Sequence, residues 1–475
     1  MKGNTDREVA EEGPTAEAET TKVTHGGISV SAAGELRGAL RFAAPVLLML
    51  YLCFAGLHAA MVPTGQTGYQ NAPDEAAHLA YVRSIAAMHL PTHSQPTPFP
   101  GPTGTNGYEW HQPPLYYAVA APFLIFGEHG VRLCSILLGL VGLLLIYRGV
   151  RLLFPADPYV ALPALGLAAL TPTHIAITST VNNDVLLEVF FSATLVLLIG
   201  AMQAGLSRRS ALLIGMTIGG AILTKATGLL LLPVFGFAIF LLYRSEGSLY
   251  RSEGSQKDLL RNGAVTLVTA LLVSGWWFAR NQALYGQLLP LRLFAADFGH
   301  TAQAAPMVDA LGGWSGYFLQ AGLWTFCSFW AVYGTAHDAA KGIPRFLPEQ
   351  VYLLLGIAGL CAGIGLARVH FQRKALFNTA QLQGIQLCFL TIFLVGMAYI
   401  AFITKYFQMQ GRYLFPAMFP IVAVFTLGFR GLLPERWKNP ASILLLVLLG
   451  VICLAFLQAV SMGTVSVART SVLGT

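Results

Sequence analysis

The stretch Ile136-Leu-Leu-Gly-Leu-Val-Gly-Leu-Leu-Leu-Ile146, followed by Tyr147-Arg-Gly-Val-Arg151, decides the fold because it is an apolar run that ends in positive charge. The whole run, 131–150, is close to the roughly 20 residues that a helix needs to cross the hydrocarbon of a membrane. Similar runs recur along the 475-residue chain, which is 55% hydrophobic and only 11% charged. Alternating strands are absent, so the sequence predicts an all-α polytopic membrane protein.

Positive charge sets the predicted orientation of the spans, because Lys and Arg accumulate in cytoplasmic loops. Arg148 and Arg151 lie inside only if 131–150 crosses the membrane and the shorter apolar segment 115–127 lies on, or dips into, the outer interface. Alternation from this point predicts about eleven spans, with the N-terminus inside. They cover 43–62, 131–150, 158–178, 185–204, 210–224, 227–243, 263–279, 351–370, 385–404, 413–430 and 441–462.

The segments outside the spans complete the predicted organisation. Residues 1–36 are polar and acidic and lack the apolar core of a cleavable signal, so we expect a disordered cytoplasmic tail. Residues 37–475 form the transmembrane domain, with outer loops at 63–130 and 280–350. We expect helices next to the membrane in the first of these loops, and a re-entrant or peripheral segment at 316–334 in the second.

Charge and cysteine content argue against a nucleic-acid-binding protein and against a protein built on disulfides or cysteine-bound metal. The net charge of +7 comes from Lys and Arg scattered over short loops, without the basic patch that binds nucleic acid. The six cysteines lie in apolar segments without metal-ligand spacing, so we expect free, packed thiols. Membrane lipid is therefore an expected partner, and nucleic acid is not.

Two adjacent carboxylates, Asp74 and Glu75, follow the first span in the stretch Asn71-Ala-Pro-Asp-Glu-Ala-Ala-His78. An ionisable group at membrane depth costs about 2.5–3.5 kcal/mol, so a group of this kind near lipid suggests a function. Asn71 is expected to cap a helix, on which His78 shares a face with Asp74 at the i+4 position. A structural alternative stays open for both acids, because the first turn of a helix favours negative charge.

A second motif, Trp110-His-Gln-Pro-Pro-Leu-Tyr-Tyr117, lies later in the same loop. Its proline pair starts a helix and restrains the backbone at His111, which makes His111 a candidate site residue. Tyr116 is a candidate for substrate contact, with anchoring at the membrane interface as the alternative.

Further polar residues fall at the predicted outer ends of later spans. Lys225 lies amid apolar sequence and is expected either to bind an anion such as phosphate or to extend its charge to the membrane surface. Arg412, in Gln410-Gly-Arg-Tyr413, is a similar candidate for binding an anion, and its guanidinium can donate two parallel hydrogen bonds to one phosphate. The other candidates on this face are Asp184, Arg280 and Tyr413. Carboxylates and histidine also suit Mg²⁺ or Mn²⁺, although no dedicated spacing is present. The residues that would hold such a cation are Asp74, Glu75, His111 and Asp184.

Together these motifs resemble the GT-C superfamily of polytopic glycosyltransferases, which includes protein O-mannosyltransferases and lipid A aminoarabinose transferases. Pro73-Asp-Glu75 is similar to their acidic motif in the first outer loop, and His111-Gln-Pro-Pro-Leu-Tyr-Tyr117 to their His-Pro-Pro-Leu element, with Gln112 as an extra residue. The stretches that carry the rest of the resemblance are Asn183-Asp184, Thr224-Lys225, Trp277-Phe-Ala-Arg-Asn281 and Gln410-Gly-Arg-Tyr413. The pattern is most similar to a bacterial membrane family, domain of unknown function 2142, over about residues 40–430.

The resemblance implies a GT-C-like fold and inverting transfer of a sugar from a polyprenyl-phosphate donor to an acceptor hydroxyl, on the extracytoplasmic face of a bacterial inner membrane. It implies catalytic roles for Asp74, as general base, and for Glu75 beside it. The residues expected to bind substrate are His78, His111, Tyr116, Asp184, Lys225, Arg280, Arg412 and Tyr413. The expected acceptor is a lipid-linked or cell-envelope glycan, and a divalent cation is the one cofactor left open.

A secondary transporter or flippase for a lipid-linked or small anionic substrate is the alternative function. Such a protein would carry ionisable residues in mid-span and two similar halves built around broken helices. The sequence has no charged residue at the clear centre of a predicted span and no second half-repeat, so we favour the enzyme.

Overall fold

The computed structural model describes residues 30–64, 72–95, 108–155, 157, 159–244, 252–334 and 345–473. These residues are almost entirely helical, and the β pairing among them consists of two isolated bridges. The predicted all-α fold class is therefore confirmed. Two sequence predictions lie outside the described residues, namely the cap Asn71 and most of the predicted tail, residues 1–29.

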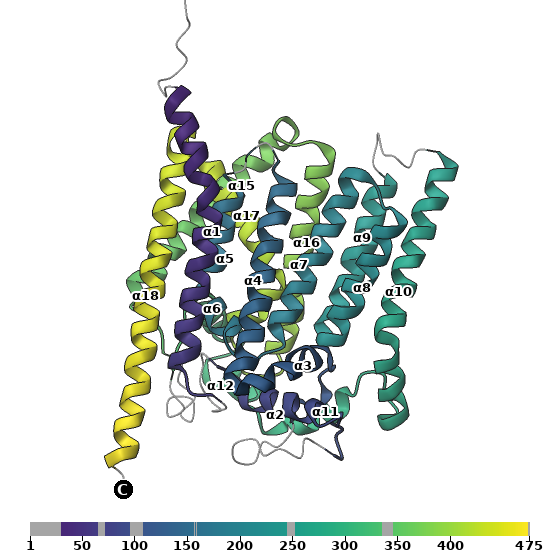
Figure 1. Cartoon of the computed structure of the whole chain (residues 1–475), viewed down its shortest axis with the longest axis vertical. Coiled ribbons are helices and arrows are strands. Elements are labelled where there is room, and N and C mark those ends of the chain that lie inside the picture. Colours follow the sequence, from purple (N-terminus) through teal and green to yellow (C-terminus); the bar gives the residue numbers. More distant parts are fainter. Residues whose placement is uncertain are drawn as a thin grey trace, which may run out of the picture. The chain divides into compact units, whose positions relative to one another are not determined.

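The chain divides into two compact units, Met1–Ala43 and Ala44–Thr475. Helix α1 runs from Val30 to Met61, so it begins inside the segment that the sequence predicts as a tail. The other long helices belong to the second unit (Figure 1). They are α4 (Gly127–Leu153), α7 (Asp184–Ala204), α8 (Arg208–Thr224), α9 (Leu231–Arg244), α10 (Glu253–Tyr285), α15 (Glu349–Leu376), α16 (Thr379–Ile403), α17 (Met418–Leu432) and α18 (Glu435–Leu473).

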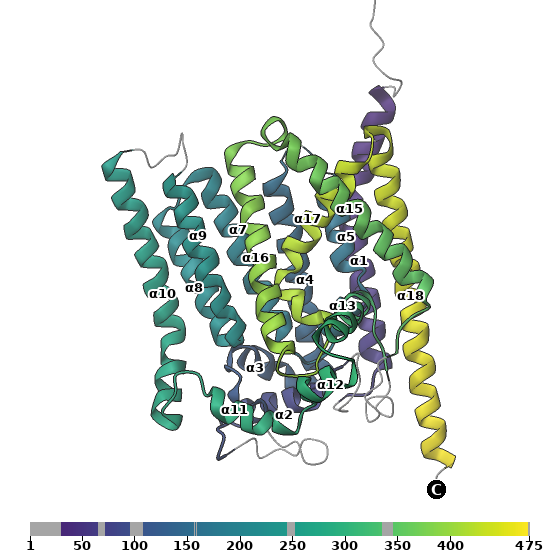
Figure 2. The same cartoon turned by 180° about the vertical axis from the view of Figure 1, so that it is seen from behind.

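Each of the predicted spans coincides with a helix or a helix pair of the described residues. Nine helical segments there are long and apolar enough to cross a membrane, and a bent helix pair makes a tenth. The eleventh predicted span corresponds to α8, whose 17 residues make it shorter than the others. Helix α8 packs along α7 and α10 (Figure 2). A multi-pass membrane protein is therefore the architecture that length and composition support.

The predicted continuous span 158–178 is wrong in one respect, because it is broken into α5 (Ala161–Ala169) and α6 (Pro172–Thr178). The two helices are bent by 65° relative to each other. Pro172 has no N–H to continue the helical ladder, and it drives the residue before it into an extended conformation. Thr171 accordingly has φ −80° and ψ 114°.

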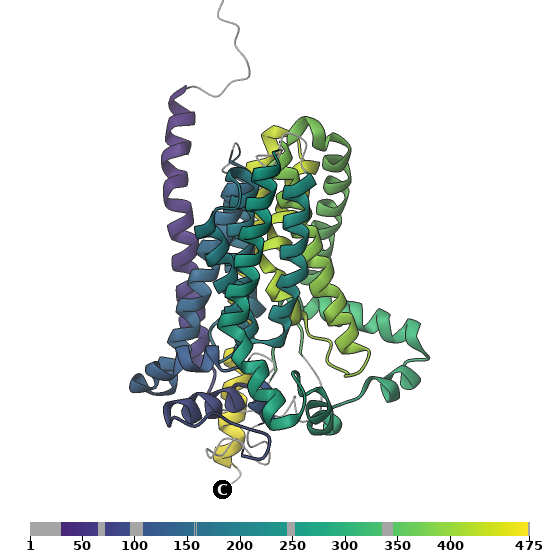
Figure 3. The ribbon, with the colours of Figure 1, turned by 90° about the vertical axis from the view of Figure 1, so that its right-hand side faces the viewer.

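Short helices gather at one end of the long helices in the second unit, and we call this the site end (Figures 1 and 3). They are α2 (Glu75–Ala86), α3 (Leu115–Ala120), α11 (Leu291–Asp297) and α12 (Ala304–Ala310). Figure 2 shows α13 (Trp314–Trp330) nearly end-on, so this helix lies across the bundle axis. The separate helix predicted at 115–127 consists of α3 and the 3-10 helix η2 (Ala121–Phe126).

The centre of the bundle lies between α4, α7 and α17. Leu143, Leu187 and Phe419 are fully buried there, one from each helix. Lipid tails are as apolar as these side chains, so close packing rather than escape from water holds such helices together.

Candidate functional site

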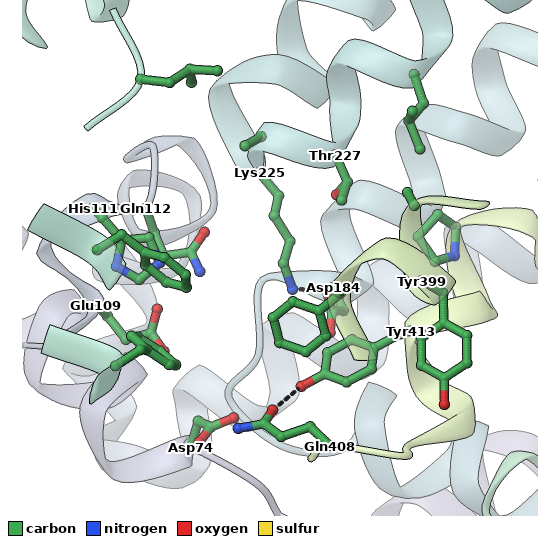
Figure 4. A pocket seen from close by; sticks show the side chains of 18 of the residues that line it. Asp74, Glu109, His111, Gln112, Asp184, Lys225, Thr227, Tyr399, Gln408 and Tyr413 are labelled. Atoms are coloured by element: carbon green, nitrogen blue, oxygen red, sulfur yellow. Dashed lines mark hydrogen bonds and ion pairs between the residues drawn. The ribbon is translucent and has the colours of Figure 1, made fainter. Parts of the chain in front are cut away.

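A cavity of about 360 Å³ lies at the site end (Figure 4). Side chains from α2, α7, α11 and α16 line it, together with the 3-10 helices η1 (Tyr108–His111), η3 (Ala226–Leu230) and η5 (Gly411–Ala417). The structure places seven of the ten predicted site residues in its lining. They are Asp74, His78, His111, Asp184, Lys225, Arg412 and Tyr413.

Asp74 occupies the residue position just before α2, with φ 61° and ψ 5° in the left-handed region. A non-glycine residue with positive φ is uncommon and tends to occur at functional sites. Its side chain makes no capping hydrogen bond to the helix that it precedes. Instead, Asp74 Oδ2 accepts a hydrogen bond of 2.9 Å from Arg412 Nη2. Capping therefore does not account for this carboxylate, although the helix N-terminus still favours its negative charge.

Arg412 is held in place by the close approach of η5 to α13. A Cβ atom on Gly411 would lie 2.3 Å from the backbone nitrogen of Phe329, so only glycine fits there. The Gly411 N–H donates to Ser328 Oγ at 2.8 Å, which fixes the start of η5. The neighbouring Arg412 is then buried, with Nε donating to Gln410 Oε1 at 2.6 Å.

Lys225 and Asp184 form the second ion pair of the cavity. Lys225 Nζ lies 2.5 Å from Asp184 Oδ1, and the lysine side chain is 20% exposed. Lys225 follows α8 in an extended conformation because the chain must turn sharply into η3. At that turn a Cβ atom on Gly228 would lie 2.3 Å from the backbone of Ala221. The close approach of these two backbone segments thus aims the lysine at the start of α7.

Arg412 joins the two ion pairs into one network of alternating charge. Its Nη1 lies 3.6 Å from Asp184 Oδ2, while its Nη2 contacts Asp74. Four separate segments of the chain thus supply two carboxylates and two cations to the same cavity. Carboxylates of this kind can accept a proton, and fixed cations can stabilise a developing negative charge.

Three further predicted residues belong to the polar lining. His78 Nδ1 lies 2.9 Å from the hydroxyl oxygen of Tyr117, and burial lowers the pKa of His78 to about 4, so its ring is neutral at pH 7. His111 packs edge-on against Phe294 of α11, with ring centres 4.7 Å apart. Tyr413 donates its hydroxyl to Gln408 Oε1 at 2.7 Å (Figure 4).

Three predicted site residues do not line the cavity. Glu75 is fully buried and accepts from Arg132 Nε at 2.7 Å and from the Val181 N–H at 2.9 Å. Tyr116 is also fully buried, with its hydroxyl 2.8 Å from Ser135 Oγ. Arg280 donates to the carbonyl of Pro91 at 2.7 Å and stacks over the ring of Trp277. The structure thus places these three side chains in contacts outside the cavity lining, and their catalytic or substrate-binding roles stay predictions.

The sequence reasoning missed Glu109, a third carboxyl in the lining, along with Gln112, Tyr399 and Gln408. Glu109 is 5% exposed, and its Oε2 has no hydrogen-bond partner in the part of the chain that the structure describes. Burial and the nearby charge of Asp74 raise the pKa of Glu109 to about 8, which leaves the group protonated at pH 7. Its one sequence signal is its position next to the Trp110-His111 motif.

The proposed cation site receives no geometric support. Among the described residues, no group of three or more His, Cys, Asp or Glu side chains is arranged to hold a metal ion. Of the four residues that the sequence suggested, Glu75 points away from the cavity, toward Arg132. A role for Mg²⁺ or Mn²⁺ stays a prediction.

Residues 111–278, about a third of the chain, match the family of dolichyl-phosphate-mannose-protein mannosyltransferases. The matched segment contains His111, Asp184 and Lys225, whereas Asp74 and Arg412 lie outside it. No curated protein sequence is significantly similar to the chain. The family match confirms the predicted resemblance to GT-C glycosyltransferases over this segment. The closer resemblance to domain of unknown function 2142 stays a prediction.

The chain is similar to several solved structures at low sequence identity. ArnT from Cupriavidus metallidurans bound to undecaprenyl phosphate is 14% identical, with a TM-score of 0.48, and the match covers 90% of this chain and 75% of that one. The Archaeoglobus fulgidus oligosaccharyltransferase is 12% identical, with a TM-score of 0.46, and the match covers 87% of this chain and 55% of that one. The S. cerevisiae protein O-mannosyltransferase Pmt1-Pmt2 complex bound to the sugar donor is 16% identical, with a TM-score of 0.38. That match covers 52% of this chain and 34% of the yeast chain. The chain thus spans about a third of the yeast protein and about half of the archaeal one.

Proposed function

We propose that this protein is an inverting glycosyltransferase that moves a sugar from a polyprenyl-phosphate donor to an acceptor hydroxyl on the extracytoplasmic face of a bacterial inner membrane. One observation carries the proposal: Asp74, Asp184, Lys225 and Arg412 come from four separate segments and meet in one cavity at the end of an apolar bundle. The family match of residues 111–278 supports the same reaction class.

Asp74 is the general base in this proposal. The acceptor hydroxyl transfers its proton to the Asp74 carboxylate while its oxygen forms a bond to the anomeric carbon of the donor sugar. Inversion requires the base on the face opposite the leaving group, as in inverting glycosidases. Asp74 suits this role because its side chain is 40% exposed at the cavity, whereas Asp184 is only 4% exposed.

Lys225 and Arg412 hold the leaving group. As the bond between the anomeric carbon and the phosphate oxygen breaks, the electron pair stays on the polyprenyl phosphate and its negative charge grows. Fixed cations in a site that excludes water stabilise such charge best. Asp184 keeps both cations in place, since it contacts Lys225 at 2.5 Å and Arg412 at 3.6 Å.

The decisive experiment replaces Asp74 by Asn. Asparagine tolerates the left-handed backbone at this position, so the variant should fold while losing the base. We expect transfer from a polyprenyl-phosphate sugar to fall by about 10²–10⁴-fold, the usual contribution of a general base. The measurement is formation of labelled product by the purified protein in lipid, together with its thermal stability.

A matched control is available at Asp157. Its side chain is 42% exposed and pairs with Arg430, which is 7% exposed, so the pair matches Asp74 and Arg412 in burial. Asp157 does not line the cavity, so Asp157→Asn should leave transfer unchanged. Transfer by Asp74→Asn at the level of Asp157→Asn would refute the proposed base.

A further inference from the structure

Glu109 is a buried carboxyl on the cavity wall for which the proposed transfer has no use. Its side chain is 5% exposed, and its Oε2 lacks a hydrogen-bond partner in the described part of the chain. A buried polar atom without a partner costs free energy comparable to a lost hydrogen bond. Such an atom in a binding cavity is explained when a ligand supplies the missing partner.

The local structure holds Glu109 firmly in this position. Its side chain is hydrogen-bonded to that of Gln112, and its backbone carbonyl accepts from the Gln112 N–H at 2.9 Å. The Tyr81 hydroxyl donates to the Gln112 carbonyl at 3.0 Å, which ties this turn to α2. Trp110, the next residue, is fixed by its indole N–H to Asp297 Oδ2 at 2.7 Å. These contacts hold the turn that carries Glu109 against α2 and Asp297.

The cavity has two chemically different sides. Figure 4 shows Glu109, His111 and Gln112 together on one side, with Lys225, Asp184 and Tyr413 on the other. The second side carries the cations and suits a phosphate. The first side carries no cation among the described lining residues, so it does not suit an anion.

We propose that Glu109 and Gln112 bind a hydroxyl group of the transferred sugar and so determine which sugars the cavity accepts. The inference rests on the proposed glycosyl transfer and assigns the sugar subsite to the side opposite the phosphate. A carboxyl group and an amide together offer hydrogen-bond donors and acceptors, which matches a hydroxyl group because a hydroxyl can both donate and accept.

The test compares binding of two ligands at pH 7: sugar-free polyprenyl phosphate, and polyprenyl phosphate carrying mannose or glucose, whichever the wild-type protein binds more tightly. Glu109→Ala should weaken binding of the sugar-bearing ligand by about tenfold. It should leave the affinity for sugar-free polyprenyl phosphate unchanged. Glu109→Gln should stay within about twofold of wild type for both ligands, since the amide replaces the donor and the acceptor.

Two further variants show whether the effect is confined to the side of the cavity that carries Glu109. Gln112→Ala probes the same wall through a second residue and should also weaken only the sugar-bearing ligand. Glu349→Gln removes an exposed acid that does not line the cavity and should change neither affinity. Thermal stability of each variant shows that the binding measurements concern folded protein.

Three results would overturn the inference while leaving the proposed function standing. One is equal weakening of both ligands by Glu109→Ala, and another is no weakening of either. The third is a loss in Glu109→Gln as large as in Glu109→Ala, because the amide offers a hydroxyl group a donor and an acceptor and should therefore replace the carboxyl. Failure of the wild-type protein to bind either ligand would overturn the proposed function and the sugar subsite together.

Discussion

Arg412 Nη2 donates a hydrogen bond of 2.9 Å to Asp74 Oδ2, across 338 positions of the sequence. The pair joins η5, near the end of the chain, to the residue that precedes α2. Arg412 is 6% exposed and Asp74 is 40% exposed, so the cation lies deep and the carboxylate lies at the cavity surface. Arg412 also lies 3.6 Å from Asp184, so its removal would take a cation away from both carboxylates.

Lys225 is expected to carry most of the accessible positive charge of the cavity, because its side chain is 20% exposed and that of Arg412 only 6%. Lys225→Ala should weaken binding of sugar-free polyprenyl phosphate by about tenfold or more, the value of one charged hydrogen bond. Binding to protein in detergent or nanodiscs measures this. Lys405→Ala removes an exposed lysine outside the cavity and should have no effect. If the Lys225→Ala and Lys405→Ala variants bound polyprenyl phosphate with equal affinity, Lys225 would not be a phosphate-binding residue.

Glu75 is expected to act on stability and not on the transfer step. Arg132 is fully buried, and Glu75 is its carboxylate partner. Removing one member of a buried ion pair costs about 3–5 kcal/mol, so Glu75→Gln should lower thermal stability strongly. Transfer per folded molecule should stay near the wild-type value, in contrast to Asp74→Asn. A Glu75→Gln protein with normal stability and no transfer would instead support the catalytic role predicted from sequence.

Glu109 should make stability depend on pH. Its pKa is about 8 in the folded protein against 4.5 for an ordinary glutamate, so the folded state binds one proton more than the unfolded state between these values. The stabilisation is complete below pH 4.5 and is lost as the pH rises to about 8. The difference in melting temperature between wild type and Glu109→Gln should therefore change steadily between pH 5 and 8 and then level off. A constant difference over that range would contradict the raised pKa.

Sequence patterns predicted the spans well, because a membrane demands long apolar helices whatever their packing. They were less informative about which polar side chain enters the cavity. Asp74 and Glu75 are adjacent, yet one reaches Arg412 and the other reaches Arg132. Successive residues at a helix start point in directions about 100° apart, and no sequence pattern states which direction faces the cavity. Arg132, the partner of Glu75, was not among the residues predicted from the sequence.

Glu109 illustrates a different limit of the sequence. It follows a segment rich in Gly, Pro and Thr, and nothing in its local context indicates burial. Its environment comes from residues distant in sequence, such as Asp74 and the Asp297 that fixes Trp110. The break in the span 158–178 was easier to predict, because the sequence shows Pro163 and Pro172 within the apolar run. A proline inside an apolar run predicts a bend, although the run alone predicts one straight helix.

The positive φ of Asp74 restricts evolution at this position in an unusual way. Glycine, asparagine and aspartate accept such a backbone readily, and aspartate alone among them is an acid. A glutamate would retain the charge but would occupy an unfavourable conformation at a cost of about 1–2 kcal/mol. Exchange of one acid for the other is therefore not conservative here, and homologues that keep this geometry should keep the shorter acid.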